Sequence, residues 1–321
     1  MKKQLPIHLI AVLVLFVAFS GCSKETTTTN NNTTPLTERE QAAKDYNDLY
    51  LGSFCSTSQL AWTGVDSTCV QGTISQMAYD KVLTRINYFR KICGLTNITW
   101  NSAWHDDCQK AALIMTSNNT LSTKPGPTWK CYTLGGYNAA GVSNLALGTA
   151  GYHTSQAVTS WIQNEEVGMY SVPYRRWILF SRAKDFGFGS TNRASILWCQ
   201  EHTGDPLPSG CPDYIAYPPK YIPQNLVFKR WSLGVTNVTS YYTGVDFSTA
   251  QVIMTDPSGG SVPVNIVSTA DNGAGDQTIV WVPQNINTTS STDVTYHVKV
   301  KDVKLNGIPM TFDYDVTIFK P

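Results

Sequence analysis

The sequence predicts an α+β protein in which helices come first and short strands follow, in two successive folded parts. Apolar residues recur every three or four positions in 74–92, 101–118 and 152–164, which is the period of an amphipathic helix. From residue 250 onward, short runs alternate apolar and polar residues between turn signals, as antiparallel strands do. Six prolines between residues 205 and 224 indicate a boundary between the two parts.

The helices are expected to differ in strength and in how their ends are marked. Residues 36–50 predict a short polar helix, and 74–92 predict a stronger one that stops at Gly94. Asn101 is a candidate N-cap for the helix over 101–118. The apolar face of 74–92 consists of Ile74, Met77, Ala78, Val82, Ile86 and Phe89. In 152–164 the inward-facing residues are Ala157, Val158 and Trp161.

Short strands separated by turns predict an antiparallel β-sandwich at the C-terminal end. Two turn signals, Pro257 to Gly260 and Asn272 to Gly275, separate the first of these runs. Further upstream, 195–198 also reads as a strand. The C-terminal strand-like runs are 250–255, 262–267, 278–282, 296–301 and 312–318.

The N-terminus carries the pattern of a bacterial lipoprotein signal peptide. Lys2 and Lys3 precede an unbroken apolar run, Leu9 to Phe19, which is too short to span a bilayer as a helix. Ser20 and Gly21 then place small residues directly before Cys22. Because this arrangement resembles the bacterial lipobox, we expect residues 1–21 to be removed and Cys22 to be lipidated. Stable anchoring needs more than one acyl chain, so we expect acylation of both the thiol and the new amino terminus. The alternative is an ordinary secreted protein with a coincidental cysteine.

A tether is expected between this anchor and the folded parts. Residues 26–34 are built only of threonine and asparagine, so they can bury no apolar area and should be disordered. We therefore divide the chain into 1–21, 22–50, 51–222 and 223–321, which are signal peptide, anchored tether with a short helix, first domain and β-sandwich domain.

Seven cysteines remain after Cys22, and an exported protein sits where disulfides form. Proximity in the sequence suggests three pairs and leaves Cys131 free, although spacing alone does not fix connectivity. There is no CxxC motif, which argues against a zinc ribbon. The suggested pairs are Cys55–Cys69, Cys93–Cys108 and Cys199–Cys211.

Short motifs follow one another in a fixed order across about residues 70–200. They are Asn87-Tyr88-Phe89-Arg90 with Gly94-Leu95, Ala111 to Met115, Leu121 to Pro125, Ser143 to Ala146, Trp161, Val172 to Leu179, and Gly187-Phe188-Gly189. Together they resemble the CAP superfamily, also called the SCP/PR-1-like domain. The resemblance implies a three-layer α-β-α sandwich with a broad central cleft. The trailing strands are similar to the β-sandwich tail of many bacterial extracellular members.

The resemblance also implies that two histidines and two acidic residues surround this cleft, where some members bind a divalent metal. In this sequence Thr123 and Tyr174 stand at the histidine positions, and Ser143 stands at the first acidic position. Glu165 is the candidate for the second acidic position, although its spacing from Trp161 is one residue long. Because hydroxyl groups replace imidazoles, we expect neither a metal nor another cofactor there.

The cleft is therefore expected to offer neutral hydrogen-bonding groups together with two arginines. Asn144 adds an amide to the three hydroxyls, and Arg175 and Arg176 can pair with an anion or a polar ligand. Alternatively, Arg175 forms a salt bridge with a carboxylate of the protein, and Asn144 hydrogen-bonds to the backbone.

These features predict a non-enzymatic binding module, anchored at the outer membrane or cell surface, whose ligand is a lipid, a glycan or a protein. One alternative is a hydrolase, divalent-metal-dependent or using a serine or glutamate, although no G-x-S-x-G motif is evident. Another is a structural component of the surface. A net charge of +1, with 15% charged residues, gives no reason to expect nucleic acid as a partner.

Overall fold

The computed structural model describes residues 35–149, 153–238, 240, 243–270 and 273–321. The predicted signal peptide, the lipidation site Cys22 and the Thr/Asn tether lie outside these residues. Within the described part of the chain, no helix is both long enough and apolar enough to cross a membrane. Residues 36–321 form one folded unit.

A four-stranded sheet lies at the centre of the first half of this unit, in the order β1-β3-β4-β2. β1 (Thr99–Trp100) runs parallel to β3 (Asp185–Ser190). β4 (Ala194–Trp198) pairs antiparallel with β3 on one side and with β2 (Ser143–Leu147) on the other. The sheet therefore joins segments that are widely separated in the sequence.

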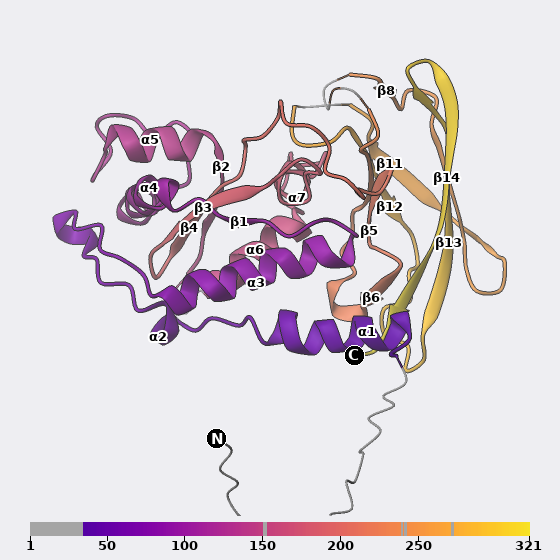
Figure 1. The fold of residues 1–321 in the computed structure, drawn as a ribbon, viewed down its shortest axis with the longest axis horizontal. Coiled ribbons are helices and arrows are strands. Elements are labelled where there is room, and N and C mark those ends of the chain that lie inside the picture. The colour runs from indigo at the N-terminus through magenta and orange to yellow at the C-terminus, as the bar shows by residue number, and fades with distance from the viewer. Residues whose placement is uncertain (1–34, 150–152, 239, 241–242, 271–272) are drawn as a thin grey trace, which may run out of the picture. The chain divides into compact units, whose positions relative to one another are not determined.

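Helices cover both faces of this sheet (Figure 1). α4 (His105–Asn118) and α5 (Leu134–Gly141) pack on one face. α3 (Gln76–Ile92), α6 (Thr154–Gln163) and α7 (Pro173–Ile178) lie on the other. The predicted α+β class and its three-layer α-β-α arrangement are confirmed.

Alternation along the strands builds a separate core on each face of the sheet. Leu145 and Ile196, which are paired residues of β2 and β4, face α4 and α5. Phe188 and Leu197 face the opposite core. At Gly189 a Cβ atom would lie 2.3 Å from the backbone nitrogen of Gln109, so only glycine lets α4 approach the sheet this closely. The Gly-Phe-Gly motif is therefore a packing feature.

The second half of the unit is a sandwich of two sheets, whose facing residues include Trp231 with Tyr296 and Tyr214 with Phe312. Among the residues described there, the strand pairs are antiparallel except β14 with β6, which run parallel. One sheet contains β10 (Ser261–Val262), β9 (Gln251–Thr255), β13 (Val294–Leu305), β14 (Ile308–Phe319) and β6 (Tyr221–Pro223), with β8 (Val245–Asp246) beside β13. The other contains β11 (Val264–Ser268), β12 (Thr278–Pro283), β7 (Trp231–Val235) and β5 (Tyr214–Tyr217).

Strand pairing places the start of this strand-rich part earlier in the chain than the predicted boundary at 222/223. β5 pairs with β7, and β6 pairs with β14, so both strands hydrogen-bond to strands that come later in the chain. The predicted boundary falls inside β6. The division into separately folding domains remains a prediction.

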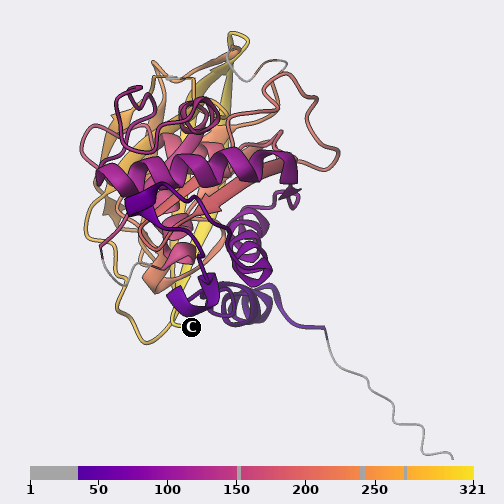
Figure 2. The ribbon, with the colours of Figure 1, turned by 90° about the vertical axis from the view of Figure 1, so that its left-hand side faces the viewer.

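The polar helix predicted over 36–50 is α1 (Glu38–Asp45), which continues into a π-helical turn, Tyr46–Leu51. Thr37 caps α1 in a capping box with Glu40. The Arg39 guanidinium lies over the Phe319 ring, so α1 packs beside the end of β14 near the C-terminus (Figure 2). The remaining short elements are α2 (Thr57–Leu60) and the 3₁₀ turns Asp66–Thr68, Ser102–Trp104 and Gln224–Leu226.

The disulfide of the structure joins Cys69 to Cys131, with 5.1 Å between their Cα atoms. The predicted pairs are therefore wrong, and so is the prediction that Cys131 is free. The turn containing Asp66 folds against the end of α4, where the Ser117 hydroxyl donates to the Asp66 carbonyl, and this brings distant cysteines together. Among the cysteines that the structure describes, those with free thiols are Cys55, Cys93, Cys108 and Cys199, all buried, and the partly buried Cys211.

Candidate functional site

Two of the predicted cleft residues, Asn144 and Tyr174, meet where β2 and α7 begin, whereas the Ser143 side chain shares the sheet face of Leu145, which packs toward α4 and α5. Ser143 and Asn144 are the first two residues of β2, and Tyr174 is the second residue of α7. The Asn144 amide donates to the backbone carbonyl of Tyr174 at 3.0 Å. The Tyr174 backbone N–H in turn donates to the Asn164 side-chain oxygen at 2.8 Å. The start of α7 is thus fixed from two sides, and the prediction that Asn144 bonds to backbone is confirmed.

Two polar atoms of this group have no hydrogen-bond partner among the described residues: Ser143 Oγ and Asn144 Oδ1. Both side chains are buried, with 1% or less of each residue exposed. Leaving a buried polar group unpaired costs about 1–3 kcal/mol. Such atoms therefore indicate positions at which a ligand or a water can complete the hydrogen bonding.

The Tyr174 hydroxyl stays neutral in this setting. Burial raises the pKa of Tyr174, and the Glu166 carboxylate and the Cys199 thiol raise it further. Burial also raises the pKa of Cys199 far above its ordinary value. Near neutral pH these groups can therefore donate hydrogen bonds but do not exchange protons readily.

The acidic residue on the Tyr174 side is Glu166, and the prediction of Glu165 needs correction. Glu165 instead accepts a hydrogen bond from the backbone N–H of Lys229 at 2.6 Å, next to the strand-rich part. The physical cause is Asn164, which ends α6 in the left-handed conformation (φ +47°) and redirects the chain. An asparagine after the last apolar residue of a helix is a sequence signal for this turn.

Thr123 lies at the edge of this group. Its backbone carbonyl is 3.6 Å from the position that a Cβ atom of Gly141 would occupy, two residues before Ser143. The Thr123 residue is exposed. It therefore lies beside the end of α5 and does not belong to the buried set.

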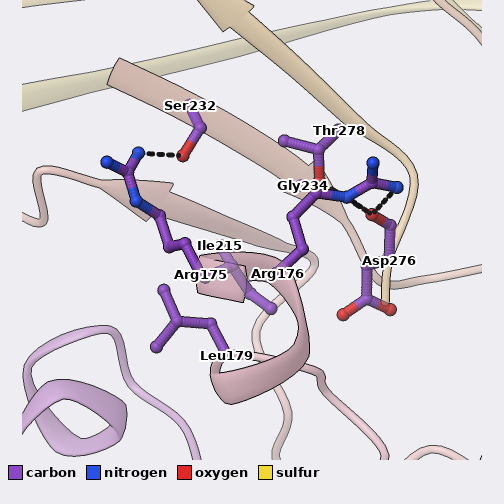
Figure 3. Close-up of a pocket in the computed structure, with 8 residues that line it drawn as sticks. All are labelled: Arg175, Arg176, Leu179, Ile215, Ser232, Gly234, Asp276 and Thr278. Carbon is purple, nitrogen blue, oxygen red and sulfur yellow. Dashed lines mark hydrogen bonds between the residues drawn. The ribbon is translucent and has the colours of Figure 1, made fainter. Parts of the chain in front are cut away.

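Arg175 leaves the cleft and enters the contact with the strand-rich part (Figure 3). Its guanidinium donates to the carbonyls of Ile162 (2.6 Å) and Arg230 (2.8 Å) and to the Ser232 hydroxyl (3.1 Å), and it lies over the Tyr217 ring. Burial lowers the pKa of Arg175 to about 10, so it stays charged at neutral pH. Its predicted role in the cleft is wrong, and its partners are carbonyl, hydroxyl and ring groups rather than the expected salt-bridge carboxylate.

Arg176 diverges from Arg175 toward β12 (Figure 3) and donates twice to the Asp276 carbonyl, at 3.1 and 3.0 Å. The Asp276 carboxylate accepts from the Ser181 N–H and hydroxyl and lies 3.5 Å from Arg182. Burial raises the pKa of Asp276, and the bonds from Ser181 oppose this. The hollow between the two arginines measures about 20 Å³, which is room for one water and not for a larger ligand.

Residues 83–200, from the middle of α3 to just beyond β4, match the model of the family described as CAP, the cysteine-rich secretory protein family. The chain contains a CAP domain. A comparison with curated proteins finds no match. Every predicted cleft residue, from Thr123 to Arg176, lies within the matched segment of the CAP domain.

The metal that some CAP proteins hold does not fit the residues of this CAP domain. Thr123, Ser143 and Tyr174 supply hydroxyls where imidazole and carboxylate would be needed, and Glu166 is the one carboxylate shown to act on Tyr174. Within the described ranges, no group of three or more His, Cys, Asp or Glu side chains could hold a metal ion. What this arrangement can do is donate and accept hydrogen bonds.

Proposed function

We propose that this protein is a non-enzymatic binding module whose CAP cleft takes a lipid, glycan or protein ligand through neutral hydrogen bonds. The observation that carries the proposal is the buried, unpartnered Asn144 Oδ1, whose amide nitrogen donates to the backbone carbonyl of Tyr174 at the start of α7. A ligand that pairs with Asn144 Oδ1 would recover the free energy that the burial of this atom costs.

The same residues argue against a hydrolase. General acid–base catalysis needs a group whose pKa lies near the working pH. The pKa values of Tyr174 and Cys199 are instead raised above their ordinary values by burial, which keeps both groups protonated. No observation favours the metal-dependent alternative over a binding role.

A binding experiment on the mature chain, residues 22–321 with Cys22→Ser, tests this proposal. The chain would be screened on lipid and glycan arrays and against extracted surface proteins, and the best ligand titrated. Tyr174→Phe removes one hydroxyl and should weaken binding about threefold to tenfold, the value of one hydrogen bond. Tyr170→Phe, at an exposed tyrosine of the loop that precedes α7, is the matched control. Chemical turnover of the ligand, or equal affinities for the two variants, would overturn the proposal.

We further propose that Cys22 anchors the protein at the outer membrane or cell surface. The apolar run and the small residues before Cys22 support this. In cell fractionation, the wild type should sediment with membranes, and Cys22→Ser should appear in the soluble fraction. If Cys22→Ser stays in the membrane fraction, lipid anchoring at this residue is excluded.

A further inference from the structure

We propose a second ligand site outside the CAP cleft, in a groove between the CAP domain and the strand-rich part, and we infer that it takes a neutral carbohydrate. This inference goes beyond the proposed function and does not depend on it, since none of its residues belongs to the cleft.

The groove consists of two adjoining hollows that share Ile92 and Lys220. The first has a volume of about 410 Å³ and lies between the end of α3, β5 and β14. The second has a volume of about 460 Å³ and lies between α1, the end of α3 and β6. Both volumes are in the range of small-molecule sites, about 300–1,000 Å³.

Aromatic rings form part of the wall of the first hollow. Tyr214 and Tyr314 line it, with ring centroids 5.6 Å apart and planes tilted by 38°. Ala216 and Pro219 extend the apolar surface. The C–H face of a sugar ring packs on such aromatic surface while its hydroxyls remain free to hydrogen-bond. A purely polar ligand would leave this surface without contacts.

The Tyr314 hydroxyl supplies an unused donor beside this wall. It is buried and has no hydrogen-bond partner among the described residues. Burial and the neighbouring Tyr214 raise the pKa of Tyr314 well above its ordinary value, so the hydroxyl keeps its proton. Because Tyr314 lines the first hollow, a ligand hydroxyl that enters beside its ring can pair with it without breaking any bond of the fold.

The charged side chains that line the groove already have partners within the fold. Lys220 pairs with Glu38, Lys91 pairs with Asp45 at 2.8 Å, and Asp315 pairs with His297 at 2.9 Å. A charged ligand would therefore find no unpaired charge of opposite sign among these groups. A lipid chain would cover charged groups without offering them hydrogen bonds, which is unfavourable. Sugar hydroxyls can bond to the free lone pairs and protons of each ion pair.

The test titrates the full mature chain with neutral oligosaccharides of two to four rings, built from glucose, mannose, galactose or N-acetylglucosamine, by calorimetry. Tyr314→Phe removes the hydroxyl, and Lys220→Met removes the ammonium but keeps an apolar stem. Each should weaken binding of the best sugar about threefold or more, the loss of one hydrogen bond. Tyr170→Phe and Lys229→Met are the matched controls and should bind as the wild type does.

Thermal midpoints close to that of the wild type establish that the variants are folded. Bound sugar should also slow amide exchange in residues 92–94, 212–220 and 312–316. The inference is overturned if no oligosaccharide saturates the protein by about 10 mM. It is equally overturned if both variants bind like their controls. Binding that Tyr174→Phe abolishes while Tyr314→Phe leaves it intact would assign the sugar to the CAP cleft instead.

Discussion

His105 is a histidine that the fold holds in its neutral form. Its Nδ1 atom accepts the backbone N–H of Phe188 at 3.1 Å, which an unprotonated nitrogen alone can do. Its ring stacks on Tyr79 with centroids 4.3 Å apart. Burial lowers the pKa of His105. The residue is thus a packing element between α4 and β3 rather than a ligand.

This environment predicts a loss of stability in acid. Because the unfolded chain binds a proton at His105 more readily than the folded chain does, its contribution to stability is complete above the unfolded pKa of about 6.5. The contribution is lost as the pH falls toward the lower folded pKa. Urea midpoints at pH 7.5 and 5 would measure this. His105→Asn, which keeps an acceptor near the Nδ1 position, should show a smaller acid loss than the wild type, and His297→Asn at the exposed histidine serves as the control.

Gly189 allows the close contact between β3 and α4, and replacing it tests that contact. A Cβ atom at this position would lie 2.3 Å from backbone that cannot move aside easily, so Gly189→Ala should destabilise the protein by about 3 kcal/mol. Gly204→Ala is the control, because no described atom lies within 4 Å of a Cβ at Gly204. Chemical denaturation would compare them. Equal stability of the two variants would show that α4 does not pack this closely.

The Cys69–Cys131 disulfide joins the loop regions on either side of α4, and we expect it to stabilise the folded chain. It closes a loop with a sequence separation of 62 residues, which corresponds to about 4 kcal/mol of lost unfolded-state entropy. Cys131→Ser should lower the unfolding free energy by about 2–4 kcal/mol, and reductant should bring the wild type to the same level. Cys211→Ser, at a free thiol, is the control. Non-reducing peptide mapping that finds any other pair would refute this assignment.

The sequence predicted some elements well and could not predict others. α3, α4 and α6 have long apolar faces, and their predicted ranges agree with the structure to within a few residues. α5 was not predicted, because its sequence, LGGYNAAG, is rich in glycine and has no helical apolar period. α7 (Pro173–Ile178) is only six residues long, so its formation depends on packing against the rest of the fold rather than on its own sequence.

Buried arginines connect the CAP domain to the strand-rich part. Arg230, which directly precedes β7, donates to the carbonyls of Asn164 (2.6 Å) and Met169 (3.0 Å), and so holds the loop that carries Glu166. Arg175 donates back to the Arg230 carbonyl. The strand-rich part therefore positions one side of the cleft, and the two parts depend on each other.

Replacing Arg230 should release this loop. Arg230→Ala removes a buried guanidinium that donates to several carbonyls, so we expect a loss of about 2–4 kcal/mol. Digestion with a protease that cuts after glutamate should become faster at Glu165 and Glu166. Lys229→Ala is the neighbouring control, since Lys229 contributes its backbone N–H to this contact. Unchanged digestion in Arg230→Ala would mean that the loop is held by other contacts.

Only the parts of the site that lie within local sequence motifs could be predicted from the sequence. Motif order placed Asn144 beside Tyr174, because strand and helix starts within one domain determine their positions. The direction of Arg175 and Arg176 depends on β7 and β12, which come much later in the chain. No local pattern in the sequence encodes that contact, just as none encodes the cysteine pairing.

Zinc titration of the mature chain tests most directly whether the CAP cleft is a neutral site. Wild type, Glu166→Gln and Glu165→Gln would be compared by calorimetry at pH 7.5. We predict that Glu166→Gln changes zinc binding no more than Glu165→Gln does, since hydroxyls replace the imidazoles that zinc prefers. One equivalent of zinc bound with micromolar affinity, lost in Glu166→Gln and kept in Glu165→Gln, would contradict the neutral cleft.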